Sequence, residues 1–333
     1  MKEALFYKKL NNNAVQCQLC PHFCFIEEDK RGKCGVRENV SGKLISLVYE
    51  KLCSIAVDPI EKKPLFHFKP GSKCLSIATV GCNLSCSFCQ NWGISQPQNK
   101  EIFGEQISAE KVVELALEKN LPGIAYTYTE PLIAIEFYLE IMKFAKKEGL
   151  YNVWVSNGFS NPEPVKKVSS YLDAVNIDLK GNTKFYSELC GVPTEKPIQE
   201  ALKIYKEQGV WIEITNLLIP GFNDKPEQIK QLVSWIKENL GYEIPLHFSR
   251  FFPTYKMAQL PETDISKLER AKKISESAGL EFVFLGNVHG KENSFCPECK
   301  SLLIERAGYS AETKGLDKKG NCAKCGYETG IVI

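Results

Sequence analysis

The 333-residue sequence lacks any long uninterrupted apolar run, so it offers no candidate for a membrane-spanning helix. It also lacks an excess of charge, because 42 Lys and Arg residues against 40 Asp and Glu residues give a formal net charge of +2. Such a balance gives no sign of the extended basic surface with which proteins bind nucleic acids or anionic membranes. The first residues lack the apolar core of a secretory signal peptide, and we therefore expect a cytoplasmic protein.

Cysteine, by contrast, is abundant, with 14 residues. In a reducing compartment, clustered cysteines are typical of metal sites rather than of disulfides. The cysteines form three groups and three singletons, namely Cys17, Cys20, Cys24 and Cys34; Cys82, Cys86 and Cys89; Cys296, Cys299, Cys322 and Cys325; and the single Cys53, Cys74 and Cys190. Neighbouring thiolates repel one another unless a cation holds them, so each group predicts a metal site. The three single cysteines are expected in the core.

Between residues 75 and 290, short apolar β-rich runs alternate with amphipathic helical stretches. Strands are expected at 75–80, 123–128, 151–156, 174–179, 210–219, 245–251 and 281–285, and helices at 108–120, 132–147, 197–208, 226–239 and 265–278. This alternation predicts an α/β fold with parallel strands, either an open doubly wound sheet or a complete or incomplete barrel. Both architectures bind ligands at the carboxyl ends of the strands. Residues 1–74 and 291–333 are expected to form small attached modules, each built round four cysteines.

The central cysteines form a C-x3-C-x2-C loop directly after the first expected strand. Three thiolates this close can bind three irons of a cubane cluster and leave the fourth iron open, whereas ordinary electron-transfer cubanes have four cysteine ligands. A structural zinc would require a fourth protein ligand, and none lies nearby in the sequence. The C-x3-C-x-aromatic-C pattern, with Phe88 as the aromatic residue, resembles the radical SAM superfamily. The resemblance implies a [4Fe-4S] cluster on Cys82, Cys86 and Cys89 that binds S-adenosylmethionine (SAM), with Phe88 beside the adenine.

Further segments extend this resemblance over nearly the whole chain. They are Cys-Gln-Leu-Cys-Pro-His-Phe-Cys at 17–24, Arg-Gly-Lys-Cys-Gly-Val-Arg at 31–37, the stretch 57–67 and Gln-Asn-Trp at 90–92. Together they look like the AmmeMemoRadiSam-system radical SAM enzymes, which are related to the activating enzymes of pyruvate formate-lyase. The implied architecture is a partial (β/α)6-type radical SAM barrel at 75–290. A Cys-rich module at 1–74 and a zinc-ribbon or rubredoxin-like module at 291–333 would flank it.

Polar residues at the ends of the expected strands are candidates for binding SAM. They are Thr129, Glu130, Ser156, Asn157, Asp178, Lys180, Asn216 and His247. Glu130 follows the strand where related activating enzymes carry a Gly-Gly-Glu-like segment, which this chain replaces by Thr-Glu-Pro. The resemblance implies that Lys180 pairs with the SAM carboxylate. Several candidates also have a structural interpretation: Glu130 as a helix cap, Asn157 as part of a turn, and His247 as a core residue.

The two end modules differ in how clearly their cysteines predict a metal. The C-terminal group consists of two C-x2-C pairs separated by 22 residues, which is typical of a tetrahedral site. Zinc is favoured there over a rubredoxin-like iron. The N-terminal C-x2-C-x3-C-x9-C group is compatible with zinc or with an auxiliary iron–sulfur cluster, and His22 could replace one ligand.

The sequence therefore predicts reductive cleavage of SAM to a 5′-deoxyadenosyl radical that takes a hydrogen atom from a substrate. A glycine of a partner protein is one candidate substrate, and a peptide or small molecule is another. A flavodoxin or ferredoxin would supply the electron. A non-catalytic iron–sulfur electron carrier is the alternative that predicts no SAM cleavage. A zinc-ribbon nucleic-acid binder is disfavoured by the balanced charge.

Overall fold

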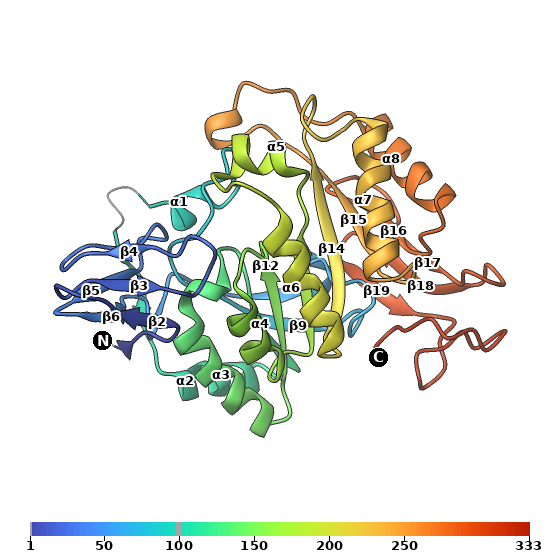
Figure 1. Cartoon of the computed structure of the whole chain (residues 1–333). Helices are drawn as coiled ribbons and strands as arrows, with labels where there is room; N and C mark the ends of the chain where they lie inside the picture. Colours follow the sequence, from blue (N-terminus) through green and yellow to red (C-terminus); the bar gives the residue numbers. More distant parts are fainter. Residues whose placement is uncertain (1, 98–100) are drawn as a thin grey trace.

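An eight-stranded sheet forms the centre of the computed structural model, which describes residues 2–97 and 101–333 (Figure 1). The parallel strands are β9 (Lys73–Ala78), β11 (Gly123–Tyr126), β12 (Tyr151–Ser156), β13 (Ala174–Asp178), β14 (Trp211–Leu218), β15 (Leu246–Arg250) and β16 (Val283–Gly286). They lie in the sheet in the order in which they follow along the chain. In a doubly wound sheet the order of the strands reverses partway across the sheet, and here it does not. The observed strand order is therefore that of a barrel. One further strand, β8 (Ser54–Pro59), pairs antiparallel with β9 at the edge.

The strands predicted from the apolar runs are confirmed, with ends that shift by one or two residues. Every residue of β11 is buried, as expected for a strand covered on both faces. Gly123 begins this strand where the ring of Tyr151 crosses it, and a β-carbon there would lie 2.0 Å from that ring. Strand β8 lies within the segment expected to form the N-terminal module, yet it belongs to the central sheet.

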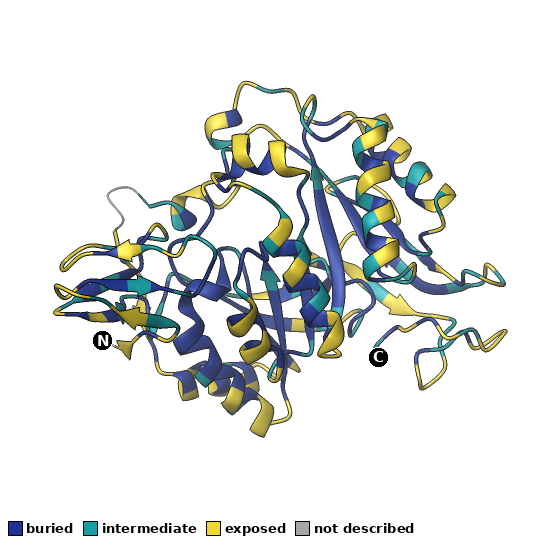
Figure 2. Ribbon diagram, in the orientation of Figure 1, coloured by how far each residue is buried: buried dark blue, intermediate teal, exposed yellow. Residues whose placement is uncertain are grey.

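Helices cover the sheet and alternate with its strands. The longer ones are α2 (Ala109–Glu118), α3 (Ile135–Lys147), α4 (Pro162–Ser169), α6 (Lys196–Glu207), α7 (Pro226–Asn239) and α8 (Ile265–Ser277). They contact each other in pairs, α2 with α3, α4 with α6, and α7 with α8. Figure 2 shows their inner sides buried and their outer sides exposed. The sequence missed α4, because two prolines in its first turn obscure the short apolar face of Val165 and Val168.

Shorter helical segments connect these elements. They are α1 (Trp92–Ser95), α5 (Thr183–Phe185), the 3₁₀ turns η1 (Ile60–Lys62), η3 (Pro131–Ala134) and η5 (Tyr255–Met257), and the π-helical η4 (Tyr186–Cys190). The helix expected at 132–147 is therefore divided. Its first turn is the 3₁₀ segment η3, which Pro131 opens and which the Glu130 side chain caps by accepting from the amide of Leu132.

The N-terminal region lies at one side of the central sheet, at the left of Figure 1. It contains two small antiparallel sheets of order β1-β6-β5 and β2-β3-β4, and a pair formed by β7 and β10. The strands are β1 (Lys2–Glu3), β2 (Tyr7–Lys9), β3 (Val15–Cys17), β4 (Phe25–Ile26), β5 (Arg37–Val40), β6 (Lys43–Ser46), β7 (Lys51–Leu52) and β10 (Glu105–Gln106). A buried ion pair between Arg37 and Glu136 of α3 joins this region to the central part.

The C-terminal region lies at the opposite side and contains a three-stranded antiparallel sheet of β17 (Ser294–Phe295), β18 (Leu302–Ala307) and β19 (Ser310–Thr313) (Figure 1). Its small core combines Leu303, Ile304 and Ile331 with Cys296 and Cys322. Arg306 of β18 is buried against the central part, where it donates to the carbonyl of Phe66. Each end region is thus attached through a buried arginine.

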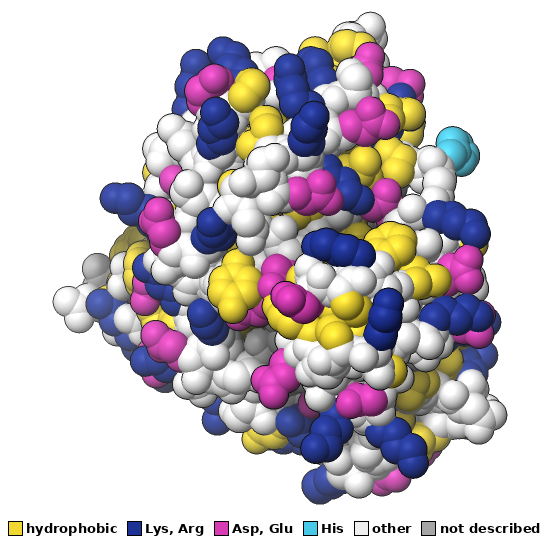
Figure 3. Space-filling view, turned by 90° about the vertical axis from the view of Figure 1, so that its right-hand side faces the viewer, with side chains coloured by type: hydrophobic (Ala, Val, Ile, Leu, Met, Phe, Trp, Pro, Cys, Tyr) yellow, Lys and Arg dark blue, Asp and Glu magenta, His cyan; other side chains and the backbone are white. Residues whose placement is uncertain are grey.

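The surface charge and the lengths of the helices agree with two expectations from the sequence, namely the balanced charge and the lack of a membrane-spanning helix. On the face shown in Figure 3, basic and acidic side chains are interspersed. Among the described residues, no helix combines the length and the apolar character needed to cross a membrane.

Candidate functional site

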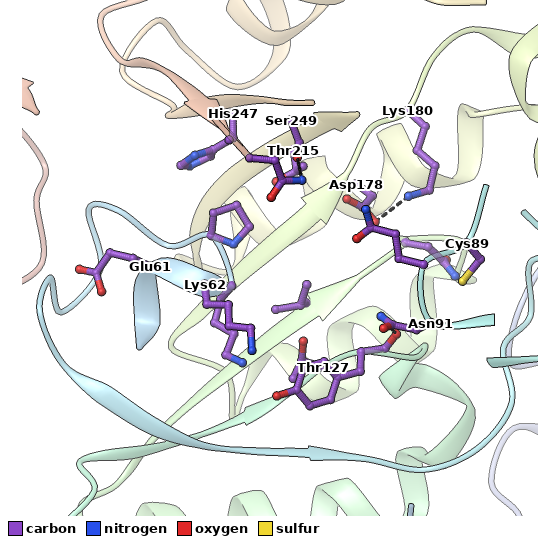
Figure 4. Close-up of a pocket in the computed structure, with 18 of the residues that line it drawn as sticks. Glu61, Lys62, Cys89, Asn91, Thr127, Asp178, Lys180, Thr215, His247 and Ser249 are labelled. Carbon is purple, nitrogen blue, oxygen red and sulfur yellow. Dashed lines mark hydrogen bonds and ion pairs between the residues drawn. The ribbon is translucent and has the colours of Figure 1, made fainter. Parts of the chain in front are cut away.

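A cavity of about 800 Å³ opens at the carboxyl ends of the central strands (Figure 4). Most of the residues predicted to form the site line it, namely Cys82, Cys86, Cys89, Thr129, Glu130, Ser156, Asn157, Asp178, Lys180 and His247. Several strands contribute, since parallel strands end at the same edge of a sheet. The position of the cavity therefore agrees with the expectation from the alternating strands and helices.

The loop that carries the three central cysteines is held by backbone contacts. Gly81, which precedes it, has a φ of +96°, and a β-carbon there would lie 2.6 Å from the side chain of Val36. The amide of Ser85 donates to the carbonyl of Cys190 at 2.9 Å, and the amide of Ser87 donates to the carbonyl of Leu189 at 2.8 Å. These bonds attach the loop to η4 and fix the direction in which it leaves β9.

The three thiols have high pKa values while no cation is bound to them. Burial, followed by the charge of nearby Glu130, raises the pKa of Cys82 well above its ordinary value. Hydrogen bonding with the Cys190 thiol, together with burial, does the same for the pKa of Cys86. Burial also raises the pKa of Cys89. The thiols would therefore remain protonated at neutral pH unless metal binding displaced the protons.

Two groups already donate hydrogen bonds to the sulfur of Cys82. The amide of Leu84 lies 3.4 Å from this sulfur, and the side-chain amide of Asn157 lies 3.6 Å from it. Such donors stabilise a negative sulfur more than a neutral one. The donor set around Cys82 thus fits a thiolate ligand of a metal cluster.

Glu130 is a buried carboxylate at the edge of the cavity. It accepts hydrogen bonds from the Ser156 hydroxyl at 2.8 Å, the Asn157 amide at 2.8 Å and the Leu132 amide at 3.0 Å. Burial raises the pKa of Glu130 to about 7, although these donors oppose the rise. The structural interpretation as a cap of η3 is correct, and the same side chain also faces the cavity.

Asp178 and Lys180 form an ion pair across the cavity edge, with 2.6 Å between Lys180 Nζ and Asp178 Oδ2 (Figure 4). Burial opposes the charge of Lys180, but Asp178 and nearby Cys86 outweigh burial, so the pKa of Lys180 lies above its ordinary value. The ammonium group therefore remains charged and is available to an anionic ligand group. Thr129, by contrast, is engaged with the protein, since its hydroxyl donates to the carbonyl of Thr79 at 2.8 Å.

Two predicted residues do not line this cavity. Phe88 is buried within the loop, where its ring lies 5.7 Å from that of Phe185. Asn216 lines a separate cavity of about 200 Å³ and donates to the carbonyl of Leu179 at 2.7 Å. Its neighbour Thr215 lines the main cavity instead, because successive side chains of a strand point to opposite faces.

His247 belongs to a buried pair that the sequence reasoning did not include. Its Nε2 lies 2.6 Å from Oε2 of Glu213, a residue with no exposed side-chain surface. Glu213 also accepts from the backbone amides of Phe66 and His67, at 2.9 and 2.7 Å. The sequence signal for this pair is Glu213 itself, because it is the single carboxylate within the apolar run 210–219. Arg250, three residues farther along β15, bonds to Glu262 instead.

A second group missed from the sequence contributes Lys62, Lys63 and Tyr128 to the wall of the cavity. Asp58 accepts hydrogen bonds from Tyr128, from Lys63 at 2.7 Å and from Lys62 at 2.9 Å. Burial alone would raise the pKa of Asp58, but these donors outweigh it and hold that pKa below its ordinary value. Tyr128 has a φ of +66°, which is uncommon outside glycine. Strained residues of this kind cluster at functional sites.

The C-terminal cysteines converge as the sequence predicted. Sulfur atoms lie 3.6 Å apart in the pairs Cys296–Cys325 and Cys299–Cys322. All four lie within 4.8 Å of one another, and no other group of three or more His, Cys, Asp or Glu side chains does so within residues 2–97 and 101–333. A tetrahedral ion with bonds of about 2.3 Å places its sulfurs about 3.8 Å apart, so this group fits a single bound metal ion.

The N-terminal cysteines surround a cavity of their own. Cys17, Cys20, Cys24 and Cys34 line a space of about 20 Å³. His22 lies beside it, but the ring Nε2 of His22 is 2.7 Å from the carbonyl oxygen of Asn83 and so has another partner. Of the three single cysteines expected in the core, Cys74 and Cys190 are buried, whereas Cys53 is only partly buried.

Comparison with known proteins identifies a matching family and several sequence relatives. Residues 76–236 match the sequence profile of the family described as "Radical SAM superfamily". An "Uncharacterized protein MJ0808" from Methanocaldococcus jannaschii is 44% identical over 336 residues and covers 100% of both chains. A pyruvate formate-lyase-activating enzyme from Clostridium pasteurianum is 24% identical over 215 residues, which cover 58% of this chain and 86% of the relative.

A solved structure also resembles this one. A radical SAM methyltransferase from Sphaerobacter thermophilus superposes with a TM-score of 0.52 at 16% sequence identity. The superposition covers 66% of this chain and 67% of the other. At this identity the likeness concerns the fold, a mixed α/β arrangement with a central parallel sheet.

Proposed function

Because the chain belongs to the radical SAM superfamily, we propose that it is an enzyme that cleaves SAM reductively and takes a hydrogen atom from a substrate. A [4Fe-4S] cluster, when bound, supplies the electron for this cleavage and the iron that holds SAM. In this proposal, the partial (β/α)6-type barrel at 75–290 carries the chemistry. The segments 1–74 and 291–333 act as attached modules of a cytoplasmic protein.

The observation that carries the proposal is the placement of Cys82, Cys86 and Cys89 on one wall of the large cavity. Three cysteine ligands would leave one iron of a cubane without a protein ligand, and the cavity that these cysteines line would offer room for a cofactor to bind it. Cys190 contacts Cys86 but is fully buried and does not line the cavity. Cys190 is therefore assigned to the packing of the loop rather than to the cluster.

Two neighbouring groups suit the charges of SAM. Glu130 presents an acceptor for the amino group, and the bonds from Ser156 and Asn157 fix its carboxylate in one orientation. Lys180 presents a cation for the SAM carboxylate, and Asp178 holds it in place. These residues are preorganised by their hydrogen bonds, so little reorganisation would accompany binding. His247 and Thr215 line the cavity beyond them, where a substrate would lie.

The finer assignment concerns the substrate, and it rests on the relatives. Similarity to pyruvate formate-lyase-activating enzymes favours a glycine of a partner protein as the hydrogen donor. The sequence motifs favour the AmmeMemoRadiSam-system enzymes as the subgroup. A peptide or a small molecule is the alternative substrate, and an electron donor of the flavodoxin or ferredoxin class would reduce the cluster. We assign structural zinc to the C-terminal four-cysteine site, with iron as the alternative.

The proposal is tested by reconstituting the protein anaerobically with iron and sulfide and adding a reductant and SAM. Formation of 5′-deoxyadenosine is expected from the parent protein and not from Cys86→Ala. The matched control is Cys190→Ala, which removes the neighbouring buried thiol and should retain cleavage. Cleavage by Cys86→Ala, or absence of cleavage in a parent protein that carries the full cluster, would contradict the enzyme assignment. The second outcome would favour the electron-carrier alternative.

A further inference from the structure

The two four-cysteine groups at the ends of the chain differ in the spacing of their sulfur atoms. In the C-terminal group all sulfurs lie within 4.8 Å of one another. In the N-terminal group, all of whose residues the structure describes, no three sulfurs lie within 4.8 Å of one another. Nevertheless Cys17, Cys20, Cys24 and Cys34 all line one cavity. The N-terminal cysteines therefore surround a common space, and their sulfur atoms are more widely spaced than those of the C-terminal group.

This wider spacing does not match that of four thiolates about 3.8 Å apart around a single tetrahedral ion. Four thiolates at about 2.3 Å from a central ion enclose no room for a water-sized sphere. The N-terminal cavity has about 20 Å³, more than the ~10–15 Å³ that one water molecule requires. In a cubane cluster each thiolate binds a different iron, so the sulfurs stand farther apart than around one ion. In the catalytic triplet Cys82, Cys86 and Cys89, the three sulfurs likewise do not all lie within 4.8 Å of one another.

The hydrogen bonds around the N-terminal sulfurs resemble those around the catalytic loop. The backbone amide of Lys33 lies 3.5 Å from the sulfur of Cys24. The buried guanidinium of Arg37 has Nη1 at 3.7 Å from the sulfur of Cys17. At the catalytic loop, the amide of Leu84 lies 3.4 Å from the sulfur of Cys82 in the same way. Donors to the sulfurs are one of the means by which proteins stabilise a cluster and set its reduction potential.

The N-terminal cavity also adjoins the catalytic loop directly. Asn83, which lies between Cys82 and Cys86 in the sequence, lines the N-terminal cavity as well. Its carbonyl oxygen is 2.7 Å from Nε2 of His22, and its side chain donates to the carbonyl of Phe159 at 2.8 Å. The ring of His22 packs at 5.2 Å from the ring of Phe159. The segment between Cys20 and Cys24 thus contacts the loop that carries the catalytic cysteines.

We propose that Cys17, Cys20, Cys24 and Cys34 hold a second [4Fe-4S] cluster rather than zinc. All four positions of this cluster have protein ligands, so it binds no SAM. Its location beside Asn83 suits the transfer of single electrons between an external donor of the flavodoxin or ferredoxin class and the catalytic loop. This role alone depends on the proposed function, whereas the identity of the metal does not.

The test measures metal content and spectra in the full-length protein, prepared anaerobically with iron, sulfide and zinc all available. The variant in which Cys82, Cys86 and Cys89 are replaced by alanine is expected to retain about four irons and four sulfides per chain. Its reduced form should give an electron paramagnetic resonance signal that added SAM does not change. Two zinc ions per chain with no sulfide in this variant would overturn the proposal.

A second set of variants separates a bound cluster from iron that associates without specific ligands. Adding Cys20→Ser and Cys24→Ser to the triple variant should remove the remaining iron and sulfide. Adding Cys53→Ala, which replaces a thiol outside the groups, should leave them in place. Iron and sulfide that persist without Cys20 and Cys24 would also overturn the proposal. If these substitutions prevent folding, the parent protein decides, because it should contain about eight irons instead of four irons and a second zinc. None of these measurements depends on SAM cleavage, so failure of the proposed function would be seen separately.

Discussion

Replacing Glu130 by glutamine is expected to weaken SAM binding and to remove its dependence on pH. The carboxylate of Glu130 faces the cavity and is held by the hydroxyl of Ser156 and the amide of Asn157. Glutamine has the same shape and can still cap η3 through its side-chain oxygen. It cannot, however, present two negative oxygens to the SAM amino group. The substitution therefore removes the charge of the acceptor, and it also replaces Oε2, which accepts from the Asn157 amide, by an NH2 group that cannot accept.

The size of the effect follows from the kind of bond that is lost. A hydrogen bond to a charged group contributes about 1.5–3 kcal/mol, about twice the contribution of a neutral one. Since about 1.4 kcal/mol corresponds to a factor of ten, Glu130→Gln should raise the Kd for SAM about 10- to 150-fold. The effect should appear in binding measured without reductant, when SAM is not consumed.

The pKa of Glu130 determines the direction of the pH dependence. Burial raises this pKa to about 7, so the side chain changes from mostly neutral to mostly ionised as the pH rises from 6 to 8. Binding of the amino group requires the ionised form. The Kd for SAM should therefore fall about tenfold between pH 6 and pH 8, because the ionised fraction rises from about one tenth to about nine tenths. Glu130→Gln should show no such fall.

Equilibrium dialysis of SAM against the reconstituted protein measures both effects. Glu61→Gln is the matched control, since Glu61 is another buried carboxylate of the cavity and lies across it from Cys89 (Figure 4). Its Kd should stay within about twofold of the parent value. Glu130→Gln with unchanged affinity, or with the same pH dependence as the parent, would refute the reasoning. Glu130 would then be only the cap of η3.

Three other predictions follow from contacts in the structure. Arg37→Met leaves Glu136 buried and unpaired, so it should lower the free energy of unfolding by about 3–5 kcal/mol, while adding Glu136→Leu should recover most of the loss. Thermal unfolding measures both variants, and an unaltered single variant contradicts the assigned pair. Cys322→Ala should lower the metal content by one ion per chain and make residues 291–333 sensitive to protease; full retention of metal would exclude the tetrahedral site. His247 should be the Nε2–H tautomer donating to Glu213, which long-range nitrogen–proton correlation spectra can establish, and an Nδ1–H tautomer would contradict this orientation.

The positions of the strands were predictable because a strand that is buried on both faces is a nearly continuous apolar run in the sequence. The parallel strands are apolar runs, and the polar residues that follow them line the cavity, as Ser156 and Lys180 do. Alternation along a strand also predicts which side chains share a face. On β14 and β15, the side chains of Glu213, Thr215, His247 and Ser249 lie on the cavity side of the sheet. The same alternation could therefore have predicted that Glu213 lies beside His247.

Other features depend on contacts between distant segments and leave no local mark. Phe88 lies away from the cavity because the bonds of Ser85 and Ser87 to η4 set the path of the cysteine loop. The group of Asp58 and Tyr128 joins residues 70 positions apart. The spacing of the N-terminal sulfurs likewise depends on how the small sheets fold, so the sequence alone left zinc and an iron–sulfur cluster both open.

The central claim is that Cys82, Cys86 and Cys89 bind a cluster with one iron open to SAM. Electron–nuclear double resonance of the reduced protein with SAM labelled by ¹⁵N in its amino group and ¹⁷O in its carboxylate tests this claim most directly. The account predicts hyperfine coupling of both labels to the cluster, and the loss of this coupling in Cys86→Ala but not in Cys190→Ala. A fully reduced three-cysteine cluster that shows no coupling to either label would contradict it.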